Sequence, residues 1–388
     1  MTYTNCTACG SGNMTSFYEV NAVPVNSVLL LETRKQALEF PTSDIRLVRC
    51  GQCGFVFNAC FDQRMTEYSG RYESTQAFSS TFAQFNRDLA CDLVERHGIR
   101  EKTVLEIGCG DGEFIRLLCE LGRNRGFAYD PAFEPTRHAQ SEAITFFSEF
   151  FDENSSTHDA DLVVCKMTLE HIVDVRRFVA TMRGAMSDSS NAVVFFQVPN
   201  ADYVFDELAF WDVYYEHCSY FTADSLGALF RNCGFDVART WTGYDDQYLM
   251  LEARVACRPH ECLSANSGPP AAGGVARFAE EVERQMSGWR DRLQAYYRGG
   301  KRIAVWGAGS KAVAFLAAIG ESPAIQDMVD INPNKAGTFL PASGYEIVLP
   351  ERLRESNPDV VIAMNPIYLA EIRRDLDALG INPELVSL

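Results

Sequence analysis

The chain has 388 residues, of which 47% are hydrophobic and 12% aromatic, so it is expected to fold into two or three domains and is not disordered. Its formal net charge of −17 at pH 7, with no cluster of lysine and arginine, argues against a nucleic-acid partner and favours a small-molecule substrate. No apolar run approaches the roughly 20 residues that span a bilayer, and no signal-peptide pattern opens the chain, which predicts a cytoplasmic monomer or homodimer without a membrane partner.

Residues 1–70 are predicted to form a small metal-binding lobe. They contain two Cys-x2-Cys pairs, each followed by a glycine. Two residues between cysteines let both sulfurs face one tetrahedral ion at about 2.3 Å, and the glycine permits a positive φ behind them. Free thiols or a redox pair are the alternative. We interpret the four cysteines as ligands of a structural zinc ion (Zn²⁺): Cys6, Cys9, Cys50 and Cys53.

Residues 71–257 alternate helical periods with short apolar strands, which predicts a doubly wound α/β sheet. The strand Thr103 to Ile107 runs into a glycine turn at residues 108–112, and a helix follows. In a nicotinamide-binding fold this helix N-terminus would receive a pyrophosphate. Glu106 and Asp111 would repel a pyrophosphate but suit a cationic sulfonium. The turn therefore predicts a site for S-adenosyl-L-methionine.

Further donor contacts are expected at the ends of the neighbouring strands. Asp130 ends the next strand and is placed to take both ribose hydroxyls. Ligands of such sheets lie outside the carboxyl ends of the strands, so the segment Met167 to Glu170 should approach the methyl donor. We interpret His171 as a cap of the next helix, with a catalytic role as the alternative. The predicted donor contacts are Glu106, Gly108, Gly110, Asp111, Asp130, Pro131, Met167 and Leu169.

A polar and aromatic segment follows the strand Val193 to Pro199. It runs from Asp212 to Phe221 and contains the motif Tyr214-x-Glu216-His217. Loops after sheet strands collect catalytic residues, and a histidine titrates near neutrality, so His217 could act as a general base. The alternative is a hydrogen-bonded histidine in a loop that covers a core. The residues alone do not decide between the two.

Residues 258–274 have linker composition, and residues 275–388 are predicted to form a second, Rossmann-like α/β domain that opens with a helix to about Tyr297. Gly307 and Gly309 follow a strand, and Asp330 ends a later one, as in the dinucleotide fingerprint. An NAD-binding redox protein or a non-catalytic nucleotide-binding protein is therefore an open alternative.

The cysteine pairs, the glycine turn and the Tyr-x-Glu-His motif occur in one order along the chain. In that order the chain resembles the nucleotide-sugar C-methyltransferases over its whole length. The resemblance implies a zinc lobe, a class I methyltransferase domain and a C-terminal domain that helps to hold a nucleotide-sugar. The segment Leu169 to Ile172 departs from the sugar enzymes, so O- or N-methylation of a related sugar or metabolite is the alternative activity.

The resemblance also implies roles for individual residues. His217 would remove the proton at C-3 of a 4-keto deoxysugar, with Glu216 and Tyr214 beside it, and Tyr72 would line the same site. The residues expected to bind the nucleotide-sugar are Gly307, Gly309, Lys311 and Asp330. Lys311 could pair with the diphosphate, and a solvated lysine is the alternative.

Overall fold

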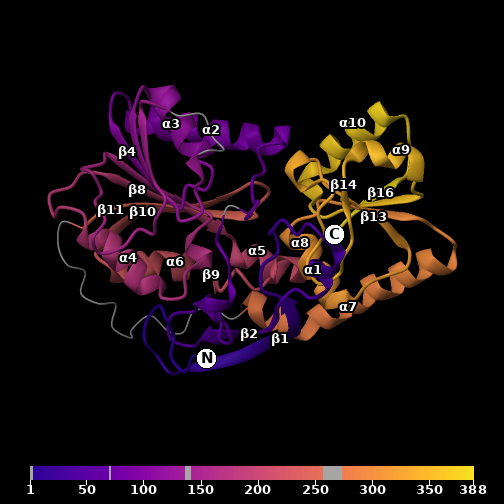
Figure 1. Cartoon of the computed structure of the whole chain (residues 1–388). Coiled ribbons are helices and arrows are strands. Elements are labelled where there is room, and N and C mark those ends of the chain that lie inside the picture. Colours follow the sequence, from indigo (N-terminus) through magenta and orange to yellow (C-terminus); the bar gives the residue numbers. More distant parts are fainter. Residues whose placement is uncertain (1–2, 70, 136–140, 257–272) are drawn as a thin grey trace.

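The computed structural model describes residues 3–69, 71–135, 141–256 and 273–388, and three sheets organise them (Figure 1). The first sheet belongs mainly to the N-terminal lobe, the second to the central part and the third to the C-terminal part. Most of the predicted linker at 258–274 lies outside the described residues. Its last two residues already belong to helix α7 (Gly273–Arg298).

The N-terminal sheet is antiparallel and includes a strand from the central part of the chain. Its own strands are β1 (Met14–Pro24), β2 (Thr42–Cys50) and β3 (Val56–Asn58). The two-residue strand β9 (Ser219–Tyr220) pairs with β3. The backbone N–H of Asn58 also donates to the Cys218 carbonyl oxygen at 2.9 Å. The loop of residues 213–218, which carries the Tyr-x-Glu-His motif, is thereby fastened to the N-terminal lobe.

The central sheet has seven strands in the order β10-β11-β8-β7-β4-β5-β6. Strands β4 to β8 pair in parallel, and β10 and β11 add an antiparallel edge. The predicted doubly wound sheet is confirmed. The strands are β4 (Thr103–Ile107), β5 (Arg125–Tyr129), β6 (Ile144–Phe147), β7 (Leu162–Lys166), β8 (Val193–Pro199), β10 (Phe235–Gly243) and β11 (Tyr248–Val255).

Helices cover both faces of this sheet, because its inner strands are apolar on both sides. One face packs against α2 (Ser80–His97) and α3 (Glu113–Gly122). The opposite face packs against α4 (Val175–Gly184) and α6 (Ala223–Asn232). The short helix α5 (Ala201–Asp206) contacts α7 of the C-terminal part. The carboxyl ends of the parallel strands are left open, where ligands of such sheets bind.

The C-terminal sheet is wholly parallel, in the order β14-β13-β12-β15-β16. Its helices include α8 (Ser310–Ile319) and α10 (Leu369–Leu379), and α7 confirms the predicted helix before the first strand. Within the described ranges, no helix has the length and apolar character of a membrane span. The strands are β12 (Ile303–Trp306), β13 (Ile325–Val329), β14 (Ile347–Val348), β15 (Val360–Ala363) and β16 (Glu384–Ser387).

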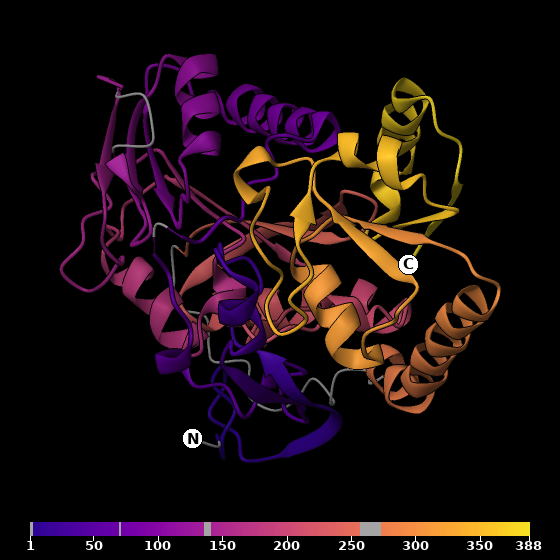
Figure 2. The same cartoon turned by 45° about the vertical axis from the view of Figure 1, so that its right-hand side comes forward.

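The three parts share one hydrophobic cluster, and Figure 2 shows that they lie against each other. The ring of Tyr18 from β1 lies 5.1 Å from that of Phe278 on α7. The ring of Phe210 in the central part lies 6.0 Å from that of Phe315 on α8. Aromatic pairs at these separations stabilise an interface beyond the area they bury. The packing therefore fixes the position of the C-terminal part relative to the central sheet.

Candidate active site

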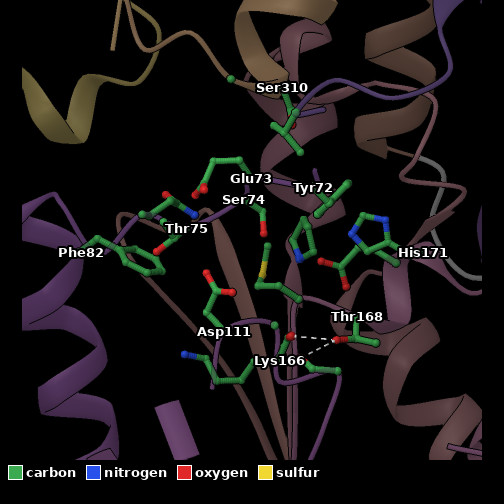
Figure 3. Close-up of a pocket in the computed structure, with 18 of the residues that line it drawn as sticks. Tyr72, Glu73, Ser74, Thr75, Phe82, Asp111, Lys166, Thr168, His171 and Ser310 are labelled. Carbon is green, nitrogen blue, oxygen red and sulfur yellow. Dashed lines mark hydrogen bonds between the residues drawn. The ribbon is translucent and has the colours of Figure 1, made fainter. Parts of the chain in front are cut away.

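One cavity of about 550 Å³ lies where the three parts meet, within the range typical of small-molecule sites. Figure 3 shows Asp111 and Lys166 near one end of it, Ser310 near the other, and Tyr72 and His171 along one side. The predicted site residues that line it are Tyr72, Glu106, Gly108, Gly110, Asp111, Asp130, Pro131, Met167, Tyr214, His217, Gly307, Gly309, Lys311 and Asp330. The predicted donor turn, base and C-terminal turn thus open into a single space.

The donor turn requires a glycine at residue 108. Its φ is +73°, and a Cβ atom there would lie 2.0 Å from Thr168 Oγ1. The Thr168 hydroxyl lies 3.0 Å from the Lys166 carbonyl oxygen and 3.4 Å from that of Gly108, and donates to both (Figure 3). The Thr168 side chain, just after β7, therefore occupies the space that a larger residue 108 would need. Its hydrogen bonds also attach the turn to the sheet.

The acidic residues of the donor end have different surroundings. Glu106 is buried and accepts a hydrogen bond from the Ile115 backbone N–H at 2.9 Å, so it braces the start of α3. Asp130 accepts from the backbone N–H groups of Gly110 and Ala132, each at 2.8 Å. Burial raises the pKa of both carboxyl groups. These two hydrogen bonds hold the Asp130 carboxylate in a fixed position at the end of β5.

Lys166 is a cavity residue that the sequence reasoning missed. It ends β7, all of whose residues are buried, and its ammonium donates to Asn86 Oδ1 at 2.6 Å. The same ammonium lies 3.8 Å from the centroid of the Phe114 ring. Burial lowers the pKa of Lys166, and the nearby Glu106 opposes that shift. A lysine at the end of an otherwise apolar strand was the sequence signal that could have found it.

His217 is buried and hydrogen-bonded within the cavity wall. Its Nε2 lies 2.8 Å from the Tyr214 hydroxyl, and the two rings are 4.0 Å apart. Its pKa is lowered well below the ordinary value, by burial first and then by His171 and Lys311. The imidazole is therefore neutral at pH 7 and able to accept a proton.

Glu216 does not line the cavity, and its carboxylate is hydrogen-bonded to the N-terminal lobe. Its carboxylate accepts from the Ser27 backbone N–H at 2.9 Å, the Ser27 hydroxyl at 2.5 Å and Asn26 Nδ2 at 3.3 Å. The Ser27 Oγ also lies 2.7 Å from the Ser310 Oγ at the start of α8. Glu216 therefore fixes the 213–218 loop at the junction of the three parts.

Two expectations for the segment after β7 are wrong. His171 does not cap the next helix, because the N-cap of α4 is Asp174, whose side chain accepts from the Arg177 N–H at 3.1 Å. His171 Nδ1 instead lies 3.0 Å from the Glu216 carbonyl oxygen, and its ring is 4.8 Å from that of His217. Leu169 is fully buried in the core and does not line the cavity, since the 3₁₀ turn it begins directs its side chain into the sheet packing.

The C-terminal glycine turn carries charges that are already paired. Gly307 has a φ of +110°, and Gly309 precedes α8. Lys311 Nζ lies 2.5 Å from both carboxylate oxygens of Asp212. Asp330 Oδ2 accepts from Lys335 Nζ at 2.9 Å. The acid that a dinucleotide fold would offer to a ribose is thus engaged by a lysine.

The four cysteines of the N-terminal lobe converge on one point. The sulfurs of Cys6 and Cys53 are 3.7 Å apart, those of Cys9 and Cys50 are 3.6 Å apart, and all four lie within 4.8 Å of one another. Four thiolates bound at 2.3 Å to a tetrahedral ion lie about 3.8 Å from each other. The following glycines have φ of +81° and +74°, as the knuckle geometry predicts. The donor set fits a tetrahedral zinc ion.

Comparison with known families matches the two α/β parts separately. Residues 82–240 match the methyltransferase domain family, and residues 267–381 match the C-methyltransferase C-terminal domain family. C-methyltransferase NovU from Streptomyces niveus is 26% identical over 321 residues, covering 78% of this chain and 76% of NovU. Residues 82–240 therefore form a methyltransferase domain and residues 267–381 a C-methyltransferase C-terminal domain, the combination expected of a C-methyltransferase. As a C-methyltransferase the chain uses S-adenosylmethionine as its methyl donor.

Two solved methyltransferase structures resemble part of this C-methyltransferase. The 1,6-didemethyltoxoflavin-N1-methyltransferase of Burkholderia thailandensis is 18% identical, with a TM-score of 0.35, covering 44% of this chain and 78% of its own. The N,N-8-amino-8-demethyl-D-riboflavin dimethyltransferase RosA of Streptomyces davawensis is 20% identical, with a TM-score of 0.38, covering 45% of this chain and 56% of its own. Each alignment covers less than half of this chain.

Proposed function

We propose that this C-methyltransferase methylates C-3 of a nucleotide-linked 4-keto deoxysugar, with His217 as the general base. A ketone at C-4 acidifies the neighbouring C–H bond. The His217 imidazole removes that proton, and the resulting enolate carbon takes the methyl group of the donor. The observation that carries the proposal is the shared cavity, which a neutral, buried imidazole and the donor turn both line. Holding carbon and methyl group in line is itself a large part of such catalysis.

Two tyrosines are suited to stabilise the enolate. Tyr72 and Tyr214 both line the cavity, and burial raises the pKa of each well above 10. Their hydroxyls therefore keep their protons and can donate hydrogen bonds to a developing oxyanion. Tyr214 also lies 2.8 Å from His217 Nε2, so while its hydroxyl donates to the imidazole it orients the base, and Tyr72 is then the donor to the oxyanion.

The C-terminal turn supports a nucleotide-sugar as the acceptor. Gly309 leads into the N-terminus of α8, where unpaired backbone N–H groups favour a diphosphate. Lys311 stands on the first turn of that helix and lines the cavity. Asp330, which stands at the position of the acid that would bind an NAD ribose, accepts hydrogen bonds from Lys335 Nζ and the Asn332 backbone N–H, each at 2.9 Å. These features favour the sugar nucleotide over the dinucleotide.

A structural zinc ion at the four cysteines completes the proposal. The sulfur spacing of 3.6 to 3.7 Å within the two close pairs supports tetrahedral coordination. The residues that would hold the ion are Cys6, Cys9, Cys50 and Cys53. Zinc would stabilise the lobe whose strand β3 pairs with β9, next to the 213–218 loop.

Solvent-deuterium exchange tests the proposed base. With a nucleotide-linked 4-keto deoxysugar in D₂O and no methyl donor, the protein should exchange the C-3 proton, and a His217→Ala variant should not. His97→Ala is the matched control. Like His217, which lies 3.9 Å from Glu170, His97 has its Nε2 near a glutamate, Glu252 at 3.2 Å, but it does not line the cavity. Unchanged exchange by His217→Ala, or a product methylated on oxygen or nitrogen, would refute the proposal.

A further inference from the structure

Glu170 is a buried acid that the proposed reaction does not yet use. It follows β7 in the 3₁₀ turn Leu169–His171, is 1% exposed and lines the cavity. Neither of its carboxylate oxygens has a hydrogen-bond partner among the described residues. Most buried polar atoms in proteins are hydrogen-bonded, because burial without a partner is costly. An unpartnered carboxyl group at a cavity wall therefore indicates that a proton or a ligand satisfies it during function.

The nearest basic atom to this carboxyl group belongs to the proposed base. Glu170 Oε1 lies 3.9 Å from His217 Nε2. That separation is beyond a direct hydrogen bond, but a small side-chain rotation or one bridging water would connect the two atoms. His171, next in sequence to Glu170, has its Nδ1 engaged by the Glu216 carbonyl oxygen. Among the described residues, His217 is the imidazole that comes within 4.0 Å of the Glu170 carboxylate, so we take it as the group with which Glu170 exchanges a proton.

We propose that Glu170 holds the proton that His217 removes from the acceptor carbon, so that the two side chains work as one base. The inference rests on the proposed function of His217. The C–H bond breaks, its electron pair stays on the substrate as the enolate, and an N–H bond forms on the imidazole. That N–H bond then breaks, an O–H bond forms on the Glu170 carboxylate, and the imidazole is neutral again. The proton leaves to solvent when the product departs.

The surroundings favour this direction of transfer. Burial raises the pKa of Glu170 to about 8, whereas burial lowers the pKa of His217 well below its ordinary value. A proton shared by the pair therefore resides on the carboxyl group. The titratable and charged groups that interact with the pair are Tyr68, Tyr72, Cys165 on β7, Tyr214, Cys218 and Tyr248 on β11 at Glu170, and His171 and Lys311, with its partner Asp212, at His217.

The proposal predicts a specific pH dependence of proton exchange. Glu170 can receive the substrate proton from His217 only when its carboxyl group is ionised. The rate of proton exchange should therefore rise with pH and level off above about pH 8. In Glu170→Gln only the imidazole titrates, well below pH 6.5, so exchange should be flat from pH 7 to 9. Its rate above pH 8 should be at least about tenfold lower than that of the wild type. Because Glu170 acts through His217, it is a positioning residue, and the pH profile is the readout that a merely structural role would not change.

The experiment measures C-3 exchange of the same 4-keto nucleotide-sugar from pH 6 to 9, with thermal unfolding of each variant. Glu170→Asp keeps a carboxyl group, so its exchange rate should again increase with pH, although the rate itself should be lower than that of the wild type. A wild-type profile in Glu170→Gln would overturn the inference while leaving His217 as the base, whereas normal exchange in His217→Ala would overturn the proposed function itself. Metal analysis that finds a second bound ion per chain, lost in Glu170→Gln while the ion at the four cysteines stays, would also overturn the inference, because Glu170 and the two imidazoles would then be metal ligands.

Discussion

The Lys311 ammonium lies 2.5 Å from both carboxylate oxygens of Asp212, and this ion pair joins α8 of the C-terminal part to the segment that leads into the 213–218 loop. Both side chains are largely buried, with exposures of 21% and 17%. Asp212 therefore pairs with the lysine that we propose as a contact of the acceptor's diphosphate. Under the proposed function, binding of the acceptor and the position of His217 would be coupled through Lys311.

Removing Asp212 distinguishes a diphosphate-binding lysine from a structural one. Asp212→Asn should free Lys311 and strengthen binding of a nucleoside diphosphate, whereas Lys311→Met should weaken binding by about tenfold, as expected for the loss of one charge-assisted contact. Isothermal titration calorimetry measures both. Lys301→Met, at an exposed lysine just before β12, is the control. Weaker binding by Asp212→Asn would mean that the ion pair only holds the two parts together.

Gly108→Ala should abolish binding of the methyl donor. The new Cβ would meet Thr168 Oγ1 at 2.0 Å in a backbone with φ of +73°, so the turn must move away from the sheet. Calorimetry with S-adenosylhomocysteine should show at least about a tenfold loss of affinity, which corresponds to about 1.4 kcal/mol. Gly184→Ala is the matched control, because nothing lies within 4 Å of its Cβ position. Equal affinities of the two variants would refute this account of the turn.

Replacing a zinc ligand should affect activity as well as stability. Cys9→Ser should lower the zinc content measured by metal analysis and lower the melting temperature. Methyl transfer should fall too, because β3 of the lobe pairs with β9 beside His217. Cys233→Ser changes a cysteine of similar partial burial outside the cluster and should leave zinc content unchanged. A protein without zinc that keeps full activity would contradict the structural role of the ion.

Stability should depend on pH in opposite directions at two buried glutamates. Burial raises the pKa of Glu170 to about 8 from an ordinary 4.5, so the folded state binds the extra proton and loses stability as pH rises from about 4.5 to 8. Glu170→Gln should therefore raise the melting temperature at pH 8.5 and have little effect at pH 4.5.

Glu252 gives the matched contrast. It is buried as well, but hydrogen bonds from Arg239 and Arg96 outweigh burial and lower its pKa to about 2. Its contribution to stability is present above about pH 4.5 and is lost as pH falls toward 2. Glu252→Gln should therefore lower the melting temperature at pH 7. Thermal unfolding followed by circular dichroism checks both variants, and the same sign of change at both sites would contradict the assigned environments.

The sequence predicted those features that short segments encode. The strand, glycine turn and helix at residues 103–122 follow from local hydrophobic period and backbone freedom, and so does the second turn at Gly307. The cysteine pairs are likewise local, and their spacing was sufficient to predict that all four sulfurs converge. Within each glycine turn and each cysteine pair, neighbours in sequence are also neighbours in space, whereas the meeting of the two cysteine pairs joins residues 41 and 47 positions apart.

The remainder depended on contacts between distant residues. The sequence placed Glu216 beside His217 as part of the catalytic group. In the structure its hydrogen-bond donors are Asn26 and Ser27, about 190 positions earlier in the chain. Asn332 and Asn334 of the C-terminal part both donate to the carboxylate of Glu73, more than 250 positions earlier in the chain. No local pattern encodes such pairs, because each residue is an ordinary loop residue until the fold brings the two together.

The pairing of β9 with β3 has a consequence for protein engineering. The 213–218 loop, which carries the proposed base, is continuous with the central part of the chain. The strand that directly follows it, β9, completes the sheet of the N-terminal lobe. Chimaeras that exchange this lobe between relatives must therefore exchange residues 213–220 with it. A junction placed only at residue 70 would combine a base from one parent with the supporting strand of another.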